Sequence, residues 1–344
     1  MGGDHGGRLT SRSIAALSGV SQTTVSRVLA GHPSVSEATR SRVLGVLEET
    51  GYTPNAAAQA MRRRRSGVLG VVVGRVTNPF FPELAEALHQ EITRRGLLLN
   101  LWISDGGEDD AGERAALDAV RRRAIDGVVY TTATPTSPSL LEAVGRAAPV
   151  VLLNRTLPGF AVDSVSSDNA GGAVALARHF VALGHRRIGF VAGLAGVTTS
   201  DEREHGFLGA LADAGAEALV VRGDFTHASG VRGIEELARA PGGPPTAVLG
   251  INDVVAFGVI DGARRLGLAV PGELSVAGYD DTEMAAWPGF DLTTVRQHTS
   301  CMAAAGVELL LERIEGDTPA APRARRLDAE LVIRSSTAAA PGSG

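Results

Sequence analysis

The sequence predicts a small all-α headpiece followed by an α/β body of two doubly wound parallel-sheet subdomains. Three observations lead to this fold class. Apolar residues recur at helical spacing in three short segments before residue 50, a run of arginines ends that region, and apolar runs alternate with helical stretches from residue 67 onward. A chain of 344 residues is long enough for two or three compact units, each with a buried core.

Three short helices are expected in the headpiece. They are separated by Gly19 and by the stretch Gly31–Pro33, which contain turn-forming residues. Ser21 is placed to cap the second helix and Ser36 the third, because a serine side chain can accept hydrogen bonds from the first free backbone N–H groups. Helices of this length are unstable alone, so we expect them to share one small core.

The second helix, in the segment SQTTVSRVLAG, has two chemically different faces. On a helical wheel, Val25, Val28 and Leu29 fall on one side. The hydrogen-bonding residues fall on the other side, namely Gln22, Thr23, Ser26 and Arg27. Any surface helix has a polar face, but the tight turn Gly19-Val20-Ser21 in a basic segment is typical of a helix-turn-helix. Such a face fits the DNA major groove, where arginine can pair with guanine.

The charge is unevenly distributed along the chain. Residues 1–66 carry nine arginines and four acidic residues, a balance of +5. Because the formal net charge of the whole chain is −5, the remaining residues carry a balance of −10. A basic unit beside an acidic body suggests that the small unit alone binds a polyanion; a solvated charged tail is the simpler alternative. All 33 basic residues are arginines, and the absence of lysine excludes P-loop nucleotide binding and Schiff-base chemistry.

Composition limits the cellular and chemical context. The single cysteine, Cys301, allows neither an intrachain disulfide nor a multi-thiolate metal site. No segment reaches the roughly 18 consecutive apolar residues of a membrane span, and the N-terminus MGGDHGGRLTSRS lacks the apolar core of a signal peptide. We therefore expect a cytoplasmic protein, nucleoid-associated when bound to DNA, with no membrane contact, no metal and no cofactor.

In the body, helical stretches separate the strand candidates, which predicts parallel sheets with right-handed crossovers. The units are too many for one open sheet, so two subdomains with a cleft between them are expected. The strand candidates are Val68–Val73, Leu97–Ile103, Gly127–Thr131, Val150–Leu153, Arg187–Ala192, Ala218–Val221, Ala247–Ile251 and Ser275–Tyr279. The helix candidates are Pro82–Arg95, Glu108–Arg123, Ala170–Leu183, Glu202–Ala214, Ser229–Arg239 and Val254–Leu266.

Polar and aromatic residues follow several of these strands. The carboxyl ends of parallel strands at a domain interface form the usual place for a small ligand. The candidates at these ends are Asn78, Phe80, Thr132, Asn154, Asn252, Asp253, Asp280 and Asp281. Asn and Asp also cap helices and form turns, so about half of these residues should have only that structural role.

The segment SIAALSGVSQTTVSRVLAG, together with VSEATRSRVLGVLEETGYTPNAAAQAM, resembles the DNA-binding headpiece of LacI/GalR-type transcription regulators. The resemblance implies that Gln22 and Thr23 read bases and that Arg27 contacts DNA. It places Ser21, Thr24 and Ser26 at positions that contact phosphates or support the helix. Ala30 is a departure, because the family often has asparagine there.

The same resemblance implies a hinge helix after the headpiece that lies in the minor groove. Asn55 and Ala58 match this hinge, and Met61 stands where the family usually has a leucine wedge. The segment then continues into the arginine run MRRRRSG, where the family often has a glycine. Read alone, this run favours a solvated linker; between a DNA-reading headpiece and a ligand-binding body it is interpreted as the element that couples them.

Most of the body resembles the effector-binding core of the same family, itself similar to periplasmic sugar-binding proteins. The resemblance rests on VTNPFFPELA, SSDNAGGAVALARHFVALGHRRIGFVAG, REHGFLGAL, AVLGINDVVAFGVIDGARRLGLAVPGELSVAGYDD, LTTVRQ and ELVIRSST. It implies that Arg203, Asn252 and Asp280 hold the ligand and that Phe225 stacks on it. It also implies that Phe80, Asn154 and Gln297 are further pocket positions. Trp287 and Phe290 depart from the family's proline-rich segment.

The chemistry of the implied ligand set favours a sugar. A guanidinium, an amide and a carboxylate can together bond adjacent hydroxyls, and the aromatic residues would cover the C–H face. The alternative is a purine or another polar metabolite, because the same cleft would serve both. A non-transcriptional sugar-binding protein would need export and would have no use for the headpiece.

An enzyme is disfavoured because the chain lacks the G-x-S-x-G, H-E-x-x-H and dinucleotide-loop motifs, the only G-x-G being Gly342 to Gly344 at the tail. His179 and His185 have no companion cluster for a metal. The C-terminus STAAAPGSG has no leucine heptads, so a homodimer is expected. We therefore expect a repressor that binds double-stranded operator DNA under the control of a small-molecule effector.

The predicted domains are a headpiece at 8–53, a hinge or linker at 54–66 and an effector-binding domain at 67–338. Within the last, the N-subdomain is expected at about 67–166 and 296–326, and the C-subdomain at about 167–295 and 327–338.

Overall fold

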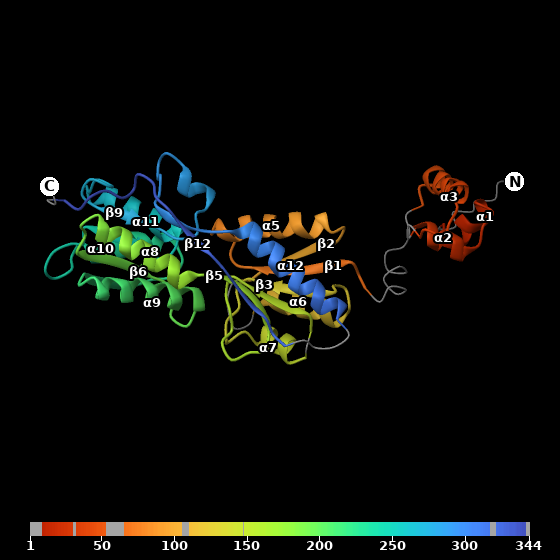
Figure 1. The fold of residues 1–344 in the computed structure, drawn as a ribbon, viewed down its shortest axis with the longest axis horizontal. Coiled ribbons are helices and arrows are strands. Elements are labelled where there is room, and N and C mark those ends of the chain that lie inside the picture. The colour runs from red at the N-terminus through yellow and green to blue at the C-terminus, as the bar shows by residue number, and fades with distance from the viewer. Residues whose placement is uncertain are drawn as a thin grey trace. The chain divides into compact units, whose positions relative to one another are not determined.

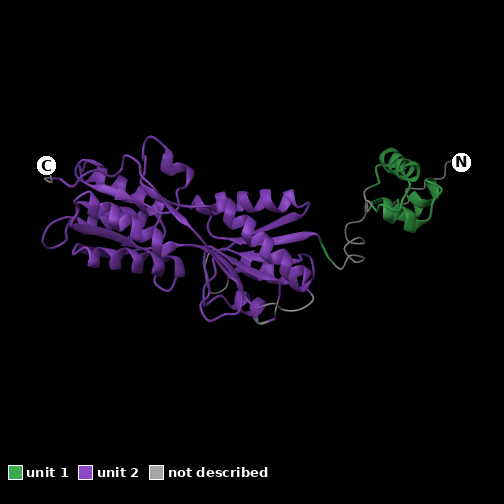
Figure 2. Cartoon of the chain, viewed as in Figure 1, with its two compact units in different colours: residues 1–66 green, residues 67–344 purple. Residues whose placement is uncertain are grey.

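The computed structural model describes residues 9–29, 32–52, 65–104, 110–146, 148–316 and 321–341. The chain separates into two compact units, Met1–Ser66 and Gly67–Gly344 (Figure 2). Among these described ranges, no helix is both long enough and apolar enough to cross a membrane.

The described residues of the first unit form three helices, α1 (Ser11–Leu17), α2 (Gln22–Leu29) and α3 (Glu37–Thr50) (Figure 1). Its core contains Ile14, Ala15, Val25, Val28 and Val43, so all three helices contribute to one small cluster as expected. Gly19 lies in the turn between α1 and α2 and has a φ of 64°, a conformation that glycine adopts without strain.

The N-subdomain of the second unit contains a six-stranded parallel sheet. Its strands, in spatial order, are β11 (Ala324–Leu327), β5 (Asp163–Ser167), β4 (Val150–Leu153), β3 (Gly127–Tyr130), β1 (Val68–Val73) and β2 (Leu98–Ile103). Successive side chains of β1 enter different cores, because strand residues alternate between the two faces. Val71 packs with α5 (Phe80–Arg94) and α12 (Thr299–Glu315), whereas Val72 packs with α6 (Ala111–Arg121) and α7 (Pro138–Gly145).

The C-subdomain contains a four-stranded parallel sheet. In spatial order its strands are β7 (Glu217–Arg222), β6 (Arg187–Ala192), β8 (Ala247–Gly250) and β9 (Ser275–Ala277). Its helices are α8 (Asn169–Ala182), α9 (Thr198–Asp213), α10 (His227–Leu237) and α11 (Asp253–Arg265), with the short 3-10 helix η1 (Glu283–Ala286) after β9. The antiparallel pair β10 (Thr294–Gln297) and β12 (Ala329–Val332) lies beside this sheet, joined to it by a bridge between Asp280 and Arg296.

The predicted fold class is confirmed: a helical headpiece precedes two parallel-sheet α/β subdomains. The predicted strands Val68–Val73, Val150–Leu153 and Arg187–Ala192 match β1, β4 and β6 in full. Four strands and two helices had not been predicted, namely β5, β10, β11, β12, α7 and α12. β5 has the sequence DSVSS, yet all of its residues are buried, so its polar composition hides a central strand.

Three single residues connect the two subdomains. Asp168 separates β5 from α8, His298 separates β10 from α12, and Asp328 separates β11 from β12. At each of these points the chain passes from an element of one subdomain to an element of the other. The subdomain limits inferred from the sequence stay predictions.

Candidate functional sites

The first candidate site is the exposed face of α2 in the headpiece. Val25 and Val28 are buried, whereas Gln22, Thr23 and Arg27 are exposed, so the two-faced helix expected from the sequence is confirmed. Among the described residues, the Arg27 side chain has no hydrogen-bond or ion-pair partner. In the described headpiece this face therefore presents the Arg27 cation, which has no partner there, and several hydrogen-bonding groups.

Short polar contacts fix the start of α2. The Ser21 Oγ accepts a hydrogen bond from the Thr24 backbone N–H at 3.0 Å, as predicted for a cap. The Gln22 side chain donates to Ser11 Oγ at 2.7 Å and so ties α2 to α1, while Ser26 Oγ donates to the Gln22 carbonyl at 3.1 Å. Ser36 occupies the expected position before α3 but makes no side-chain bond to that helix backbone.

Four further headpiece and hinge positions were singled out from the sequence. Ala30, Asn55, Ala58 and Met61 lie outside the described residues, as do the arginines at 62–64. Their roles on DNA stay predictions.

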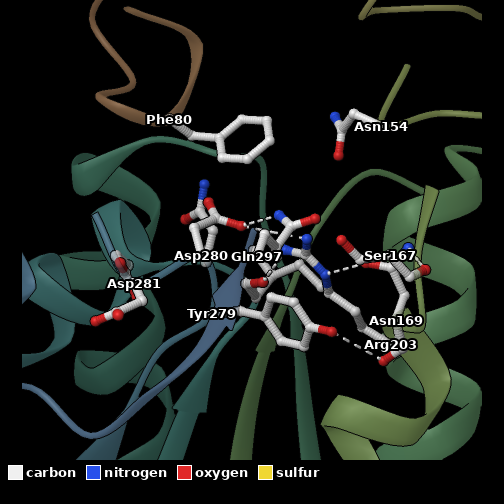
Figure 3. Close-up of polar contacts among 12 residues, drawn as sticks. Phe80, Asn154, Ser167, Asn169, Arg203, Tyr279, Asp280, Asp281 and Gln297 are labelled. Atoms are coloured by element: carbon white, nitrogen blue, oxygen red, sulfur yellow. Dashed lines mark hydrogen bonds and ion pairs between the residues drawn. The ribbon is translucent and has the colours of Figure 1, made fainter. Parts of the chain in front are cut away.

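The second candidate site is a buried polar cluster centred on Arg203 of α9 (Figure 3). The Arg203 Nη2 donates to Asp280 Oδ1 at 3.2 Å, and its Nη1 donates to the Ile251 carbonyl at 2.9 Å. Its guanidinium carbon lies 3.7 Å from the centre of the Tyr279 ring. Gln297 completes the cluster by donating to Asp280 Oδ1 at 2.7 Å. The predicted residues Arg203, Asp280 and Gln297 are thus brought together from three distant segments.

Asp280 and its neighbour Asp281 have different environments. Both have positive φ, 123° and 55°, and their side chains point in different directions (Figure 3). Asp281 accepts from Arg296 at 2.7 Å and from Arg334 at 2.6 Å, so it fastens β10 and the segment after β12. Asp280 instead faces Arg203 and Gln297. Two adjacent carboxylates therefore serve a structural clamp and a candidate ligand site.

Asn252 and Asp253 are used inside the protein. The Asn252 Oδ1 caps α11 by accepting from the Val255 N–H at 2.9 Å. The Asp253 carboxylate accepts from Thr294 Oγ1 at 2.6 Å and from the Thr282 N–H at 2.8 Å. Asp253 is therefore one of the strand-end residues that have only a structural role, as expected from the sequence for about half of them. For Asn252, the Oδ1 is already engaged in this cap, and no described residue accepts from its Nδ2.

Phe80 and Asn154 face the Arg203 cluster from the N-subdomain (Figure 3). Phe80 is buried and packs edge-on against Phe81, with ring centres 5.5 Å apart. Asn154 follows β4 with a φ of 67°, and its Nδ2 donates to the Thr131 carbonyl at 3.5 Å. Phe225, the remaining predicted position, lies under the guanidinium of Arg155, whose carbon is 5.7 Å from the ring centre.

Several buried acceptor or hydroxyl atoms at this site have no partner in the described part of the chain. They are Asn154 Oδ1, Gln297 Oε1, Ser167 Oγ, Ser200 Oγ and Thr132 Oγ1. A buried polar atom without a partner is costly, and such atoms are uncommon in folded proteins. Their concentration around Arg203, Arg155 and Phe225 indicates a site that a polar ligand would complete.

Burial shifts the acidity of the two central carboxyls. It raises the pKa of Asp280 to about 6, against the lowering effect of the Arg203 charge and of the hydrogen bonds from Gln297 and Arg203. Burial, reinforced by the charge of Asp280, also raises the pKa of Asp253 well above its ordinary value. Among the residues that the structure describes, no three His, Cys, Asp or Glu side chains form a group suited to a metal.

Sequence reasoning did not assign Asn169, Tyr279 or Arg155 to the site. The Asn169 Oδ1 accepts from Arg203 Nε at 2.9 Å, and its Nδ2 donates to Glu202 at 3.0 Å. Asn169 and Tyr279 lie within segments already quoted for the family resemblance, but nothing in their local pattern distinguishes a supporting residue. Arg155 follows Asn154 directly, and only its environment in the fold sets it apart.

Comparisons with known proteins agree with this architecture. The family model "Bacterial regulatory proteins, lacI family" matches residues 11–55, and the model "Periplasmic binding protein-like domain" matches residues 177–337. The chain is 31% identical over 335 residues to the HTH-type transcriptional repressor CytR of Escherichia coli (strain K12), covering 96% of this chain and 97% of CytR. It is 35% identical over 345 residues to the regulator MalR of Streptomyces coelicolor, covering 96% of each.

Solved structures give the same result. The lac repressor dimer bound to operator and the anti-inducer ONPF matches with a TM-score of 0.83 and 26% identity, covering 97% of this chain and all of that one. The transcriptional regulator CelR in complex with cellobiose matches with a TM-score of 0.72 and 31% identity, covering 96% of this chain and 100% of that one.

A helix-turn-helix headpiece joined to a periplasmic-binding-protein-like body defines the class of ligand-responsive transcription regulators. The chain belongs to the lacI family of bacterial regulatory proteins. It is accordingly a DNA-binding transcriptional regulator with an effector-binding domain, and not an enzyme.

Proposed function

We propose that the protein is a homodimeric repressor whose affinity for operator DNA is controlled by a sugar bound at the Arg203 cluster. The observation that carries this proposal is the pairing of Arg203, Asp280 and Gln297 beside unpartnered Asn154 and Gln297 oxygens. Adjacent sugar hydroxyls both donate and accept, so they can satisfy a guanidinium, a carboxylate and two carboxamide oxygens together. A purine is the second candidate; it would need flat stacking on both of its faces.

The headpiece surface supports operator binding. Gln22 and Thr23 are exposed at the start of α2, where recognition helices contact base edges, and Arg27 is exposed in its last turn. The residues Ser21, Thr24 and Ser26 are assigned to phosphate contact or to support of the helix. The lac repressor structure that resembles this chain is a dimer bound to operator.

The edge strand β2 supports a homodimer. It ends the six-stranded sheet and exposes 68% of Leu98, 45% of Leu101 and 50% of Ile103. An apolar sheet edge in water invites pairing with another chain, and a second copy of this chain would cover it. We place the dimer in the cytoplasm, where operator DNA lies.

A two-stage measurement tests the proposal. A thermal-shift screen of the full-length protein against neutral sugars, sugar derivatives, nucleosides and nucleobases would find the effector, because a ligand that binds the folded state raises its stability. An operator would be selected from random-sequence DNA, and its affinity measured with and without that effector. We expect a change of roughly 5- to 150-fold, which corresponds to a typical coupling free energy of about 1 to 3 kcal/mol.

Two outcomes would count against the proposal. Stabilisation by nucleosides or nucleobases and by no sugar would assign the site to the second candidate. A sugar that stabilises the protein without changing operator affinity would show that the body binds sugar but does not control the headpiece.

A further inference from the structure

Arg155 carries a charge that the described protein does not balance. Arg203 has Asp280 as its partner, and Arg313 has Asp163, but no described carboxylate lies within ion-pair distance of Arg155. Burial, followed by the nearby positive charge of Arg203, lowers the pKa of the Arg155 guanidinium to about 10. It is therefore still charged at neutral pH. Arg155 is partly buried, and a cation withdrawn from water without a counter-charge is unfavourable unless something else compensates it.

The hydrogen-bonding capacity of Arg155 is also largely unused. A guanidinium has five N–H donors, of which Nη1 donates to the Thr132 carbonyl at 3.4 Å. The Nε is buried and has no partner in the described chain. One face of the group lies over the Phe225 ring at 5.7 Å. The donors that remain form the planar fork that suits the two oxygens of a carboxylate or phosphate.

Two buried hydroxyls in this region have no hydrogen-bond partner among the described residues. Thr132, whose carbonyl Arg155 contacts, has a buried Oγ1 without a partner, and so has Ser200 of α9. A Cβ at Gly193 would lie 2.8 Å from Ser200 Oγ and 3.0 Å from the Phe225 ring, so Ser200 and this ring both border Gly193. Both hydroxyls can donate to an anion, and Ser200 is 0% exposed.

The amino terminus of α9 contacts the chain next to Arg155. Thr198, the first residue of this helix, accepts through its Oγ1 from the Thr156 N–H at 3.1 Å, next to Arg155 in the chain. The residue before α9, Val197, makes no side-chain cap bond within the described chain, and the first N–H groups of a helix favour negative charge. Asp201, also in the first turn, is turned to the Gly196 N–H at 3.1 Å.

We infer that Arg155, Thr132, Ser200 and the first turn of α9 bind an anionic group of the effector, a phosphate or a carboxylate carried by the sugar. This inference rests on the proposed sugar-binding function of the neighbouring Arg203 cluster. Asn154 links the two regions, because it precedes Arg155 and faces the Arg203 cluster. The sugar hydroxyls are bound by Asp280, Gln297 and Asn154, and the anionic substituent by Arg155. The ligand class is therefore a sugar phosphate or a sugar acid rather than a neutral sugar.

Matched ligands test the inference directly. The full-length protein is titrated by calorimetry, at one ionic strength, with neutral monosaccharides and disaccharides, with their phosphate esters, and with the aldonic and uronic acids derived from them. Inorganic phosphate alone is included. We expect at least one anionic sugar to bind about tenfold or more tightly than its neutral parent sugar. A hydrogen bond between charged groups is stronger than a hydrogen bond between neutral groups. The phosphate and acid series then identify which anion is bound.

The variant Arg155→Gln should remove this preference. We expect it to weaken binding of the anionic sugar by roughly 10- to 100-fold while changing the affinity for the neutral parent by less than about threefold. The matched control is Arg186→Gln, because Arg186 also donates to backbone carbonyls but is exposed. Arg155→Lys, which keeps the charge and loses the fork, should give an intermediate affinity and serves if the Gln variant does not fold.

The possible failures can be told apart. If a neutral sugar binds at least as tightly as all its anionic derivatives, the anionic subsite is overturned and the proposed function stands. The same holds if Arg155→Gln leaves anionic binding unchanged. If nucleosides or nucleobases bind and no sugar of either kind does, the proposed sugar function itself fails.

Discussion

The face of α2 and the Arg203 cluster are both polar, but their polar groups are satisfied differently. On α2, Gln22, Thr23 and Arg27 are exposed to water, so nothing is lost while the DNA is absent. In the body, Gln297 and Ser200 are almost fully buried, and each has an atom that finds no hydrogen-bond partner in the described part of the chain. A surface that binds a large polyanion can remain hydrated, whereas a site that encloses a small molecule leaves part of its hydrogen bonding to that molecule.

This difference makes the two sites unequal in cost. Hydrated polar groups on a helix face lower the free energy of unfolding little. The positions of these groups follow from the local sequence pattern of α2. Buried polar atoms without partners lower the stability of the ligand-free protein. The effector should therefore stabilise the body, while DNA binding should depend mainly on the contacts made in the complex.

The largest expected effect is at Asp280. Asp280→Asn should lower effector affinity by about 2 to 5 kcal/mol, roughly 30-fold or more, because it alters one partner of a buried, hydrogen-bonded charge pair. Operator affinity without effector should stay within about threefold, as the headpiece is a separate unit. Both affinities can be measured with the sugar that gives the largest thermal shift.

Asp281→Asn is the matched control for this prediction. Asp281 bonds Arg296 and Arg334, so its substitution should lower the melting temperature and leave effector affinity unchanged. If both substitutions weakened the effector equally, the division of labour between the two carboxylates would be wrong.

At the headpiece, Arg27→Ala should lower affinity for the selected operator by about 1 to 3 kcal/mol, as expected for an arginine that pairs with a guanine. Affinity for random DNA of the same length should fall much less. Competition binding at one salt concentration measures both. Equal losses on the two DNAs would mean that Arg27 contacts only phosphate.

Acidification should weaken the effector site and spare α2. The pKa of Asp280 is raised to about 6 in the folded protein, so the carboxylate becomes protonated as the pH falls from 7.5 to 5. The neutral acid accepts from sugar hydroxyls more weakly than the carboxylate, and effector affinity should fall about tenfold over that range. Titrations of the wild-type protein with the effector at several pH values would show this fall. If the Asp280→Asn variant showed the same dependence of affinity on pH, Asp280 would not be its cause.

The same pKa shift has a consequence for stability. An acid whose pKa is raised by folding binds its proton more tightly in the folded chain than in the unfolded one. The contribution of Asp280 to stability is therefore present below its ordinary pKa of 3.8 and is lost as the pH rises through about 6. Asp280→Asn should make the melting temperature depend less on pH between about 3.8 and 6.

The smallest effect is expected at the helix cap. Ser21→Ala removes the acceptor of the Thr24 N–H and should destabilise the headpiece by about 1 kcal/mol. Hydrogen exchange of the α2 amides in the full-length protein measures this loss. Ser36→Ala is the comparison, and it should cost less because Ser36 makes no cap bond. Equal losses would show that the observed cap geometry does not matter.

Local pattern predicted most of the fold. Apolar runs such as Val68–Val73 defined the buried parallel strands, and the wheel of α2 gave its two faces. β5 was missed because serine and aspartate do not read as strand residues, although the sheet buries them. β11 and β12 were missed because they have only four residues each, lie at sheet ends and lack a regular alternation of polar and apolar residues. α12 has helical apolar spacing at Met302, Gly306 and Leu310 and could have been predicted.

The effector site was less accessible from the sequence. Arg203 and Gln297 were placed there only by resemblance to a family, because no local rule links residues so far apart in the chain. Asp280 was also a candidate from its position at a strand end. The sequence could not separate Asn252, whose oxygen caps a helix, from a free ligand contact. Arg155 was invisible for another reason: whether a charge is balanced depends on which carboxylates the fold brings near it.

The links at Asp168, His298 and Asp328 determine what kind of motion an effector can cause in the body. Each link is one residue long and offers two soft backbone torsions. Three such tethers without slack resist shear and separation of the two lobes, since either movement would stretch a link. A rocking movement needs only small torsional changes at these points. Rocking of the two lobes is therefore the movement that ligand binding can drive at the lowest conformational cost.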